Sequence, residues 1–293
     1  GLKWSFETES LLISTPSVGN VNDDNFLEII FSGYSNNDTN YFVFSHDGEN
    51  LSQINISDKS RSGFAVGDFN QNGFDDVTFG TDSNNLYLIY DNINIAEGFP
   101  FEADDKFQLS PIMLNLPFKN VIIAPCENKT LYSIKENGEL DFSIEFDDYI
   151  STSPSILNIN DQILIFIGLN NGKIYAIDIF GEIQFEYNVS SKVIGSILFS
   201  DFNNDFEPEI ISVNSMGDLS IFNLDGHYYK NFPIEYDFPY SSPCLIDDID
   251  SDLDLEIFCG TTNSLVGIDI KDSSYNNTYW NMYGGNHKRN NYY

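Results

Sequence analysis

Basic residues are scarce in this sequence: 13 Lys and Arg stand against 45 Asp and Glu among 293 residues, for a formal net charge of −32. A surface of this charge repels nucleic-acid phosphates and anionic lipids, so we expect no nucleic-acid partner. Apolar runs are also short, well below the roughly 20 residues of a membrane-spanning helix, so we expect no membrane insertion. The chain begins at Gly1 rather than Met, so it is either processed or trimmed, and processing would agree with export.

Cysteine and histidine are equally rare. The three cysteines, Cys126, Cys244 and Cys259, are too few for a disulfide framework. Cys244 and Cys259 flank one acidic segment, and both a disulfide and two free apolar thiols remain open for them. His46 and His227 lie beside Asp-Gly pairs and are interpreted as solvent-facing turn residues. No nucleophile elbow, phosphate-binding loop or zinc-protease motif occurs, so we predict no catalytic residue and no organic cofactor.

Helical periodicity is the next feature that the sequence lacks, since no segment combines a 3.6-residue apolar period with capping residues. Aromatic residues make up 15% of the chain, with 25 Phe and 17 Tyr, and these residues favour pleated strands. Asn, Ser, Asp and Gly separate the apolar runs and are typical of turns. The sequence therefore predicts an all-β protein.

One unit repeats along the whole chain. Six segments, starting at residues 14, 62, 110, 153, 195 and 242, open with a small residue and a short apolar strand, at spacings of 42 to 48 residues. Each continues with a second strand, a polar turn, an alternating third strand and, in most repeats, an aromatic fourth strand. This period and strand number are typical of propeller blades. We predict a single domain over residues 1–293, a six-bladed β-propeller of four-stranded antiparallel blades.

The two ends of the chain suggest how such a ring closes. Residues 2–8 resemble a fourth strand without the three that should precede it, while the fourth strand of the last repeat is ambiguous. We therefore predict that the N-terminal strand completes the last blade. The tail, residues 272–293, is expected to pack across this closure or to extend from it.

The segments between the first and second strands carry the chemistry. In four of the six repeats, oxygen-bearing side chains occupy positions i, i+2, i+4 and i+8 of this segment. These acidic loops are the first loop (Asn20, Asn22, Asp24, Glu28), the second (Asp68, Asn70, Asn72, Asp76), the fifth (Asp201, Asn203, Asp205, Glu209) and the sixth (Asp248, Asp250, Asp252, Glu256). Position i+6 varies in type (Phe26, Phe74, Glu207, Asp254), so we expect its backbone carbonyl to be the ligand, as at the seventh position of an EF-hand loop.

Turn preference alone explains one such loop, because Asn, Asp and Gly form turns readily. Four recurrences at the same phase, each closed by an acid, favour a metal, and oxygen-only ligands favour Ca²⁺ over zinc. We predict up to four calcium ions, in repeats one, two, five and six. The loops of repeats three and four are shortened and are not expected to bind metal. The sixth loop has the most carboxylates and is predicted to hold its ion longest.

The second loop and its flanks, Gly-Asp-Phe-Asn-Gln-Asn-Gly-Phe-Asp-Asp-Val over residues 67–77, resemble the FG-GAP or VCBS-type repeat of integrin-α-like propellers. The segment Trp-Asn-Met-Tyr-Gly-Gly-Asn-His at 280–287 is similar to the closing segment of related bacterial surface propellers. This resemblance implies a calcium-stabilised protein that is secreted or at the cell surface and serves adhesion or glycan binding.

Three functions are consistent with this reading. The first is a non-catalytic propeller that binds a glycan or a protein at a cell surface or in extracellular matrix. The second is a polysaccharide-degrading enzyme of the lyase type on the same scaffold. The third is a subunit of a surface assembly that associates through its aromatic C-terminal tail.

Overall fold

The computed structural model describes residues 1–293 except 25, 37, 161 and 272–278. The described residues form antiparallel sheets and no helix, which confirms the all-β prediction. Consequently no described helix has the length and apolar character needed to cross a membrane. The chain divides into two compact units, Gly1–Phe146 with Lys288–Tyr293, and Asp147–His287.

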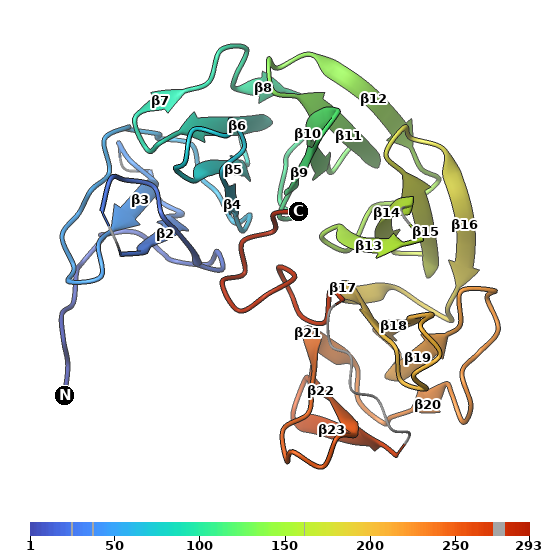
Figure 1. Ribbon diagram of the computed structural model, residues 1–293. Helices are drawn as coiled ribbons and strands as arrows, with labels where there is room; N and C mark the ends of the chain where they lie inside the picture. Colours follow the sequence, from blue (N-terminus) through green and yellow to red (C-terminus); the bar gives the residue numbers. More distant parts are fainter. Residues whose placement is uncertain (25, 37, 161, 272–278) are drawn as a thin grey trace. The chain divides into compact units, whose positions relative to one another are not determined.

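Unit one contains three sheets (Figure 1). The first consists of β1 (Ser17–Gly19), β2 (Glu28–Ser32) and β3 (Tyr41–Phe44). The second consists of β4 (Ala65–Gly67), β5 (Asp76–Gly80) and β6 (Asn85–Tyr90), with β7 (Asn94–Ile95) and β8 (Phe101–Glu102) both paired to β6. The third consists of β9 (Ile112–Leu116), β10 (Lys119–Pro125), β11 (Thr130–Lys135) and β12 (Leu140–Glu145).

Unit two also contains three sheets. The fourth sheet consists of β13 (Ser155–Ile159), β14 (Gln162–Gly168), β15 (Lys173–Asp178) and β16 (Ile183–Asn188). The fifth consists of β17 (Val193–Ser200), β18 (Glu209–Asn214), β19 (Asp218–Phe222) and β20 (Ile234–Glu235). The sixth consists of β21 (Tyr240–Asp247), β22 (Leu255–Thr261) and β23 (Leu265–Ile270). The first three predicted strands of every repeat thus pair in the predicted order. The first and sixth sheets have three strands among the described residues, so the prediction of four-stranded blades is confirmed only in part.

Apolar side chains fill the space between neighbouring sheets of each unit. In unit one, Tyr41 of β3 stacks on Phe79 of β5 at 5.7 Å between ring centres, and both are fully buried. In unit two, Phe166 of β14 meets Phe199 of β17 edge-on at 4.8 Å. Aromatic pairs of this kind hold sheets face to face, because each ring buries a large apolar area. This packing keeps the ends of the strands, and the loops between them, in fixed positions.

The N-terminal residues differ from the prediction. Trp4 and Phe6 pack on Phe44 of β3, at 5.9 and 4.7 Å between ring centres, and Trp4 Nε1 donates to the carbonyl of His46. Residues 2–8 form no strand, and β23 pairs only with β22 among the described residues. The predicted closing strand is therefore not confirmed, and the aromatic residues of residues 2–8 instead cover Phe44. A closed six-bladed ring stays a prediction.

The described part of the C-terminal tail packs along the first strands of the sheets. In unit one, the carbonyls of Lys288, Asn290, Asn291 and Tyr293 accept hydrogen bonds from the N–H groups of Val18, Val66, Met113 and Asn115. In unit two, the carbonyls of Trp280 and Asn281 accept from Phe199 and Ile246, each at 3.0 Å. Figure 1 shows the C-terminus beside β9. The described part of the tail thus packs on the sheets within each unit, while residues 272–278 lie outside the described residues. Packing of the tail across a ring closure stays a prediction.

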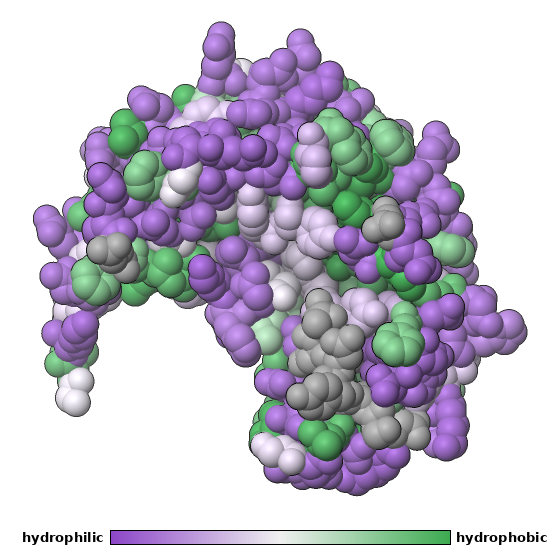
Figure 2. Space-filling view, in the orientation of Figure 1, coloured by the Kyte–Doolittle hydropathy of each residue, from purple (hydrophilic) through white to green (hydrophobic). Residues whose placement is uncertain are grey.

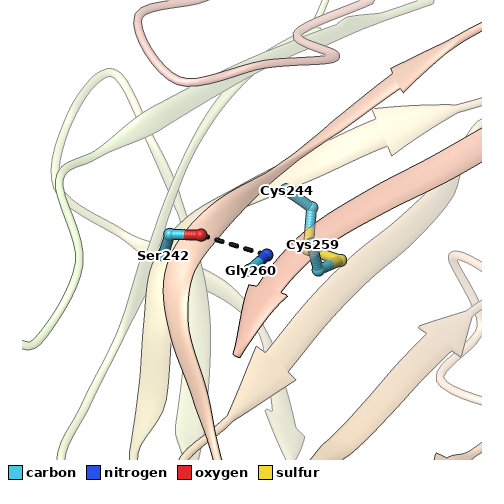
Figure 3. The surroundings of a disulfide bond; sticks show 4 residues. All are labelled: Ser242, Cys244, Cys259 and Gly260. Carbon is cyan, nitrogen blue, oxygen red and sulfur yellow. Dashed lines mark hydrogen bonds between the residues drawn. A yellow bond between two sulfur atoms is a disulfide. The ribbon is translucent and has the colours of Figure 1, made fainter. Parts of the chain in front are cut away.

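Hydrophilic residues dominate the face of the molecule shown in Figure 2, with hydrophobic residues in separate spots. Cys244 of β21 and Cys259 of β22 face each other across the sixth sheet and form a disulfide (Figure 3), which resolves the alternative that the sequence left open. Beside it, Ser242 Oγ accepts a hydrogen bond from the Gly260 N–H at 3.1 Å. The disulfide therefore joins the two strands that support the sixth loop.

Candidate metal-binding loops

The four acidic loops each connect the first strand of a sheet to the second, as predicted. In the third and fourth sheets the same connection is a tight hairpin, in which Leu116 pairs with Lys119 and Ile159 with Gln162. The closing acid of each long loop lies at or next to the start of a strand: Glu28 begins β2, Asp76 begins β5, Glu209 begins β18, and Glu256 is the second residue of β22. A strand therefore fixes the direction of each of these carboxylates.

The four loops share one hydrogen-bond pattern. The closing acid accepts from the N–H at position i+1 in every loop: Val21 to Glu28 at 3.1 Å, Phe69 to Asp76 at 3.0 Å, Phe202 to Glu209 at 2.8 Å and Ile249 to Glu256 at 2.8 Å. The side chain at i+4 accepts from the N–H at i+6: Asp24 from Phe26, Asn72 from Phe74, Asp205 from Glu207 and Asp252 from Asp254. The phase deduced from the sequence therefore corresponds to one recurring conformation.

The backbone repeats in the same way. Position i+3 has positive φ in the second, fifth and sixth loops, at Gln71, Asn204 and Ser251. Position i+5 is also left-handed, with φ of 99° at Gly73, 71° at Phe206 and 77° at Leu253. In these three loops the first acid accepts the N–H of position i+5. A residue with a Cβ loses about 1–2 kcal/mol in this conformation relative to the right-handed one, so the hydrogen bonds of the first acid hold Phe206 and Leu253 in place.

Buried oxygens without a hydrogen-bond partner test whether these loops suit a cation. In the first loop, Asn20 Oδ1, Asn22 Oδ1 and Glu28 Oε1 are buried and unpartnered, and Glu28 is fully buried. In the sixth loop, Glu256 Oε1 is also buried without a hydrogen-bond partner, and Glu256 is 8% exposed. Leaving a buried acceptor unsatisfied costs about 1–3 kcal/mol, and more when it is charged. All four atoms belong to predicted ligands, so the residues fit a hard cation.

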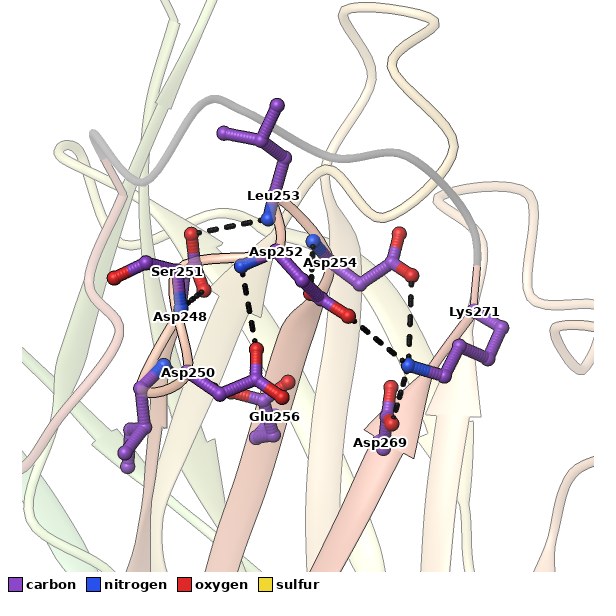
Figure 4. A network of polar contacts seen from close by, with 10 residues as sticks. Asp248, Asp250, Ser251, Asp252, Leu253, Asp254, Glu256, Asp269 and Lys271 are labelled. Atoms are coloured by element: carbon purple, nitrogen blue, oxygen red, sulfur yellow. Dashed lines mark hydrogen bonds and ion pairs between the residues drawn. The ribbon is translucent and has the colours of Figure 1, made fainter.

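The carboxylates of the sixth loop divide into two groups (Figure 4). Oxygen atoms of Asp248, Asp250 and Glu256 lie within 4.8 Å of one another, the only such group of three acids in the described part of the chain. Asp252, also a predicted ligand, instead accepts from Lys271 Nζ at 3.2 Å. Lys271 further contacts Asp254 at 3.8 Å and Asp269 at 2.6 Å. Lys271 therefore places a positive charge beside the acids of the sixth loop, which the sequence analysis overlooked.

Burial shifts the titration of the closing acids. It raises the pKa of Asp76 and of Glu209 to about 7, although backbone N–H groups stabilise both carboxylates. Burial likewise raises the pKa of Glu28, with Asp24 adding repulsion. These acids stay charged at neutral pH more readily when a cation lies beside them. A bound Ca²⁺ would supply that charge, held by the side-chain oxygens of each loop.

Two acids near the loops escaped the sequence analysis. Asp75 Oδ2 accepts from the Asn20 N–H at 2.7 Å, and the Asp75 N–H donates to the Asn20 carbonyl at 2.7 Å, so the first and second loops are joined directly. Asp91, immediately after β6, accepts from the Asn72 side-chain amide with both carboxylate oxygens, at 2.8 and 2.9 Å. Their spacing in the sequence gives no signal, since both contacts arise from the packing of the strands.

Residues of the tail also reach the loops. The hydroxyl of Tyr292 donates to the Asp68 carbonyl at 2.9 Å, and Asn115 Nδ2 donates to the same carbonyl at 3.0 Å. In unit two, burial raises the pKa of Tyr279, with further contributions from Asp201, Asp205 and Glu209 of the fifth loop. The tail predicted for self-assembly therefore has contacts inside its own chain.

Comparison with known proteins supports the fold. No family model matches the chain, and no curated protein matches it. Among solved structures, it is similar to BBS1N in complex with ARL6DN, in crystals soaked with lead (TM-score 0.61, 11% identity, 88% of this chain and 78% of that one) or with mercury (0.59, 11%, 90% and 80%). It is also similar to the WD40 β-propeller domain of Doa1 (0.54, 14%, 89% and 92%).

At these identities the similarity concerns the fold alone. The β-propeller prediction is confirmed. The likeness to FG-GAP or VCBS-type repeats stays a resemblance.

Proposed function

We propose that this chain is a non-enzymatic propeller scaffold for protein interaction, with calcium ions that stabilise its loops. The observation that carries the calcium proposal is the set of four unpartnered buried oxygens in the first and sixth loops, all on predicted ligands. The shared hydrogen-bond pattern extends the proposal to the second and fifth loops. One of the similar structures, BBS1N, is itself in complex with a protein, ARL6DN, which supports a protein partner.

We further propose that the protein works outside the cell, secreted or at the cell surface, in adhesion. The Cys244–Cys259 disulfide supports this, because disulfides persist mainly in oxidising compartments. A glycan as the bound partner and membership in the FG-GAP or VCBS-type group are finer parts of the same proposal.

Thermal unfolding with and without a chelator, together with metal analysis of the purified protein, tests the calcium part. Calcium should raise the melting temperature, and Glu28→Gln with Glu256→Gln should reduce this increase, because each removes a buried charge from a loop. Asp178→Asn is the matched control, since Asp178 closes an ordinary turn by accepting from Phe180 and Glu182. A melting temperature that ignores the chelator, with no calcium in the purified protein, would reject this proposal.

One observation favours the alternative of a polysaccharide-degrading lyase. A cavity of about 400 Å³ in unit one is lined by Tyr34, Asp58, Lys59 and Asp82, among others. The Tyr34 hydroxyl donates to Asp82 at 2.7 Å, and Arg61 donates to Asp82 at 2.9 Å. If Asp82 accepts the phenol proton, the Tyr34 phenolate can abstract a proton next to a substrate carboxylate. Lys59 and Arg61 beside the ring stabilise the negative charge. Release of unsaturated ends from uronate-containing polysaccharides, abolished in Tyr34→Phe, would support the enzyme over the scaffold.

A further inference from the structure

Large apolar side chains lie at the tips of the fifth and sixth loops. Phe206 is 77% exposed and Leu253 is 53% exposed, and both occupy position i+5. In Figure 4 the Leu253 side chain points away from the carboxylates of its loop. Ile249, also in the sixth loop, is 56% exposed. Single exposed apolar residues are ordinary, but these recur at one position of a repeated loop.

The backbone makes this position unfavourable for such residues. Phe206 and Leu253 have φ of 71° and 77°, where glycine is favoured, and the second loop has Gly73 at the same position with φ of 99°. A glycine would relieve the backbone and remove the exposed apolar surface together. Stability of the folded chain therefore accounts for neither residue. Strain retained at an exposed position is a feature of functional sites.

The two tips belong to the same end of unit two. The Phe199 N–H near the end of β17 donates to the Trp280 carbonyl, and the Ile246 N–H near the end of β21 donates to the Asn281 carbonyl. Trp280 and Asn281 are consecutive, so their Cα atoms are about 3.8 Å apart. The strands that lead into the fifth and sixth loops therefore end side by side. One partner can contact both tips.

The charge around the tips selects the kind of partner. The fifth loop has four acids (Asp201, Asp205, Glu207, Glu209) and the sixth has five (Asp248, Asp250, Asp252, Asp254, Glu256). One divalent cation in each loop, with Lys271 beside the sixth, leaves both loops negative. Such a surface repels anionic lipid headgroups and attracts basic side chains.

We propose that Phe206 and Leu253 are anchors that insert into apolar pockets of a protein partner whose surrounding surface is basic. This inference deepens the proposed scaffold function and rests on it for the existence of a protein partner. It does not depend on which metal the loops bind. The acids of the two loops require a basic surface on the partner, and the two apolar side chains require apolar pockets in it.

The test uses the double variant Phe206→Gly with Leu253→Gly and a synthetic amphipathic peptide of Lys and Leu as the probe. The variant should bind the peptide at least about tenfold more weakly, since buried apolar anchors dominate such interfaces. Its melting temperature should be unchanged or higher by about 2–4 °C, because glycine relieves the backbone. Phe180→Ala is the control, since Phe180 is 67% exposed in unit two but lies outside the acidic loops.

Equal binding of the peptide by the double variant and the wild-type protein would overturn the proposal. Equal binding of a second peptide with Glu in place of Lys would overturn its charge requirement. Binding to phosphatidylserine vesicles that depends on both tips would assign the surface to a membrane instead. Each measurement is made with calcium and with chelator. Tip-dependent peptide binding in chelator would support this inference even if the calcium proposal failed.

Discussion

Lys271 forms ion pairs with Asp252 and Asp254 of the sixth loop and with Asp269 of β23. The loop pattern assigns Asp252 to calcium. The Lys271 ammonium group and a bound cation therefore compete for the same carboxylate. Counting acids alone ranks the sixth loop as the tightest site, but the count omits this lysine. The charge available to an ion depends on which acids already have a partner.

Replacing Lys271 by Met should strengthen calcium binding to the sixth loop several-fold, since Asp252 becomes available and a nearby positive charge is lost. Calorimetric titration of the variant with calcium measures the change. Lys192→Met, which removes an exposed lysine elsewhere in unit two, controls for the change in net charge. An unchanged or weaker affinity in the Lys271 variant would show that Asp252 is no ligand.

The closing acids Asp76 and Glu209 predict a dependence of stability on pH. Their pKa values are raised from 3.8 and 4.5 to about 7 by burial. Between those values the folded, metal-free protein binds more protons than the unfolded chain, so these groups make it less stable as the pH rises toward 7. Calcium binds the deprotonated form and should stabilise more strongly at high pH.

Melting temperatures in chelator at several pH values, compared between wild type and Asp76→Asn with Glu209→Gln, isolate this contribution. The fall in melting temperature toward neutral pH should be smaller in the variant. An identical pH profile for the two proteins would contradict the assigned shifts.

At the scale of loops and strands, the paired hydrogen bonds between Asn20 and Asp75 couple the first and second loops. Asp75 immediately precedes the closing acid of the second loop, and Asn20 is the first predicted ligand of the first loop. An ion that orders one loop therefore fixes a residue of the other. We expect the two loops to bind calcium with positive cooperativity.

Asp75→Ala should remove this cooperativity and lower the free energy of unfolding by about 1–3 kcal/mol, because the Asn20 N–H loses its acceptor. Calcium titration and urea unfolding measure the two effects. Asp23→Ala, which removes an exposed acid of the first loop outside the ligand positions, is the control. Two independent binding events in both variants and in the wild type would refute the coupling.

The sequence predicted the strands and the phase of the loops because both depend on local periodicity. An acid eight residues after the first ligand already implies the carboxylate that begins the next strand, as at Glu28 and Glu209. The contacts of Asp75, Asp91 and Lys271 were not predictable in this way, since each joins residues that only strand packing brings together. The packing of Trp4 and Phe6 on Phe44 was not predictable either, because aromatic residues are equally suited to a strand and to stacking on another ring.

At the scale of the whole molecule, the short segment Lys288–Tyr293 contacts every sheet of unit one. It pairs with the first strands of all three sheets in unit one, and its Tyr292 contacts the second loop. Each of these strands would otherwise expose backbone N–H groups at an edge. The segment therefore contributes to the stability of every sheet in that unit.

Deleting residues 288–293 should lower the free energy of unfolding by about 2.5–7.5 kcal/mol, since five backbone hydrogen bonds of about 0.5–1.5 kcal/mol each are lost. Urea unfolding measures this, with Tyr292→Phe as the control that keeps the backbone pairs and removes only the hydroxyl. A deletion as stable as the wild type would show that these pairs contribute nothing.

This arrangement also constrains the order in which the protein can mature during synthesis. Unit one is discontinuous: Gly1–Phe146 leaves the ribosome first, but its last segment follows only after all of Asp147–His287. Domains generally fold as their residues emerge. The three N-terminal sheets must therefore wait, with their first strands unprotected, until the second unit has been translated. In that interval, chaperones that recognise exposed strand edges can bind the first strands of these sheets.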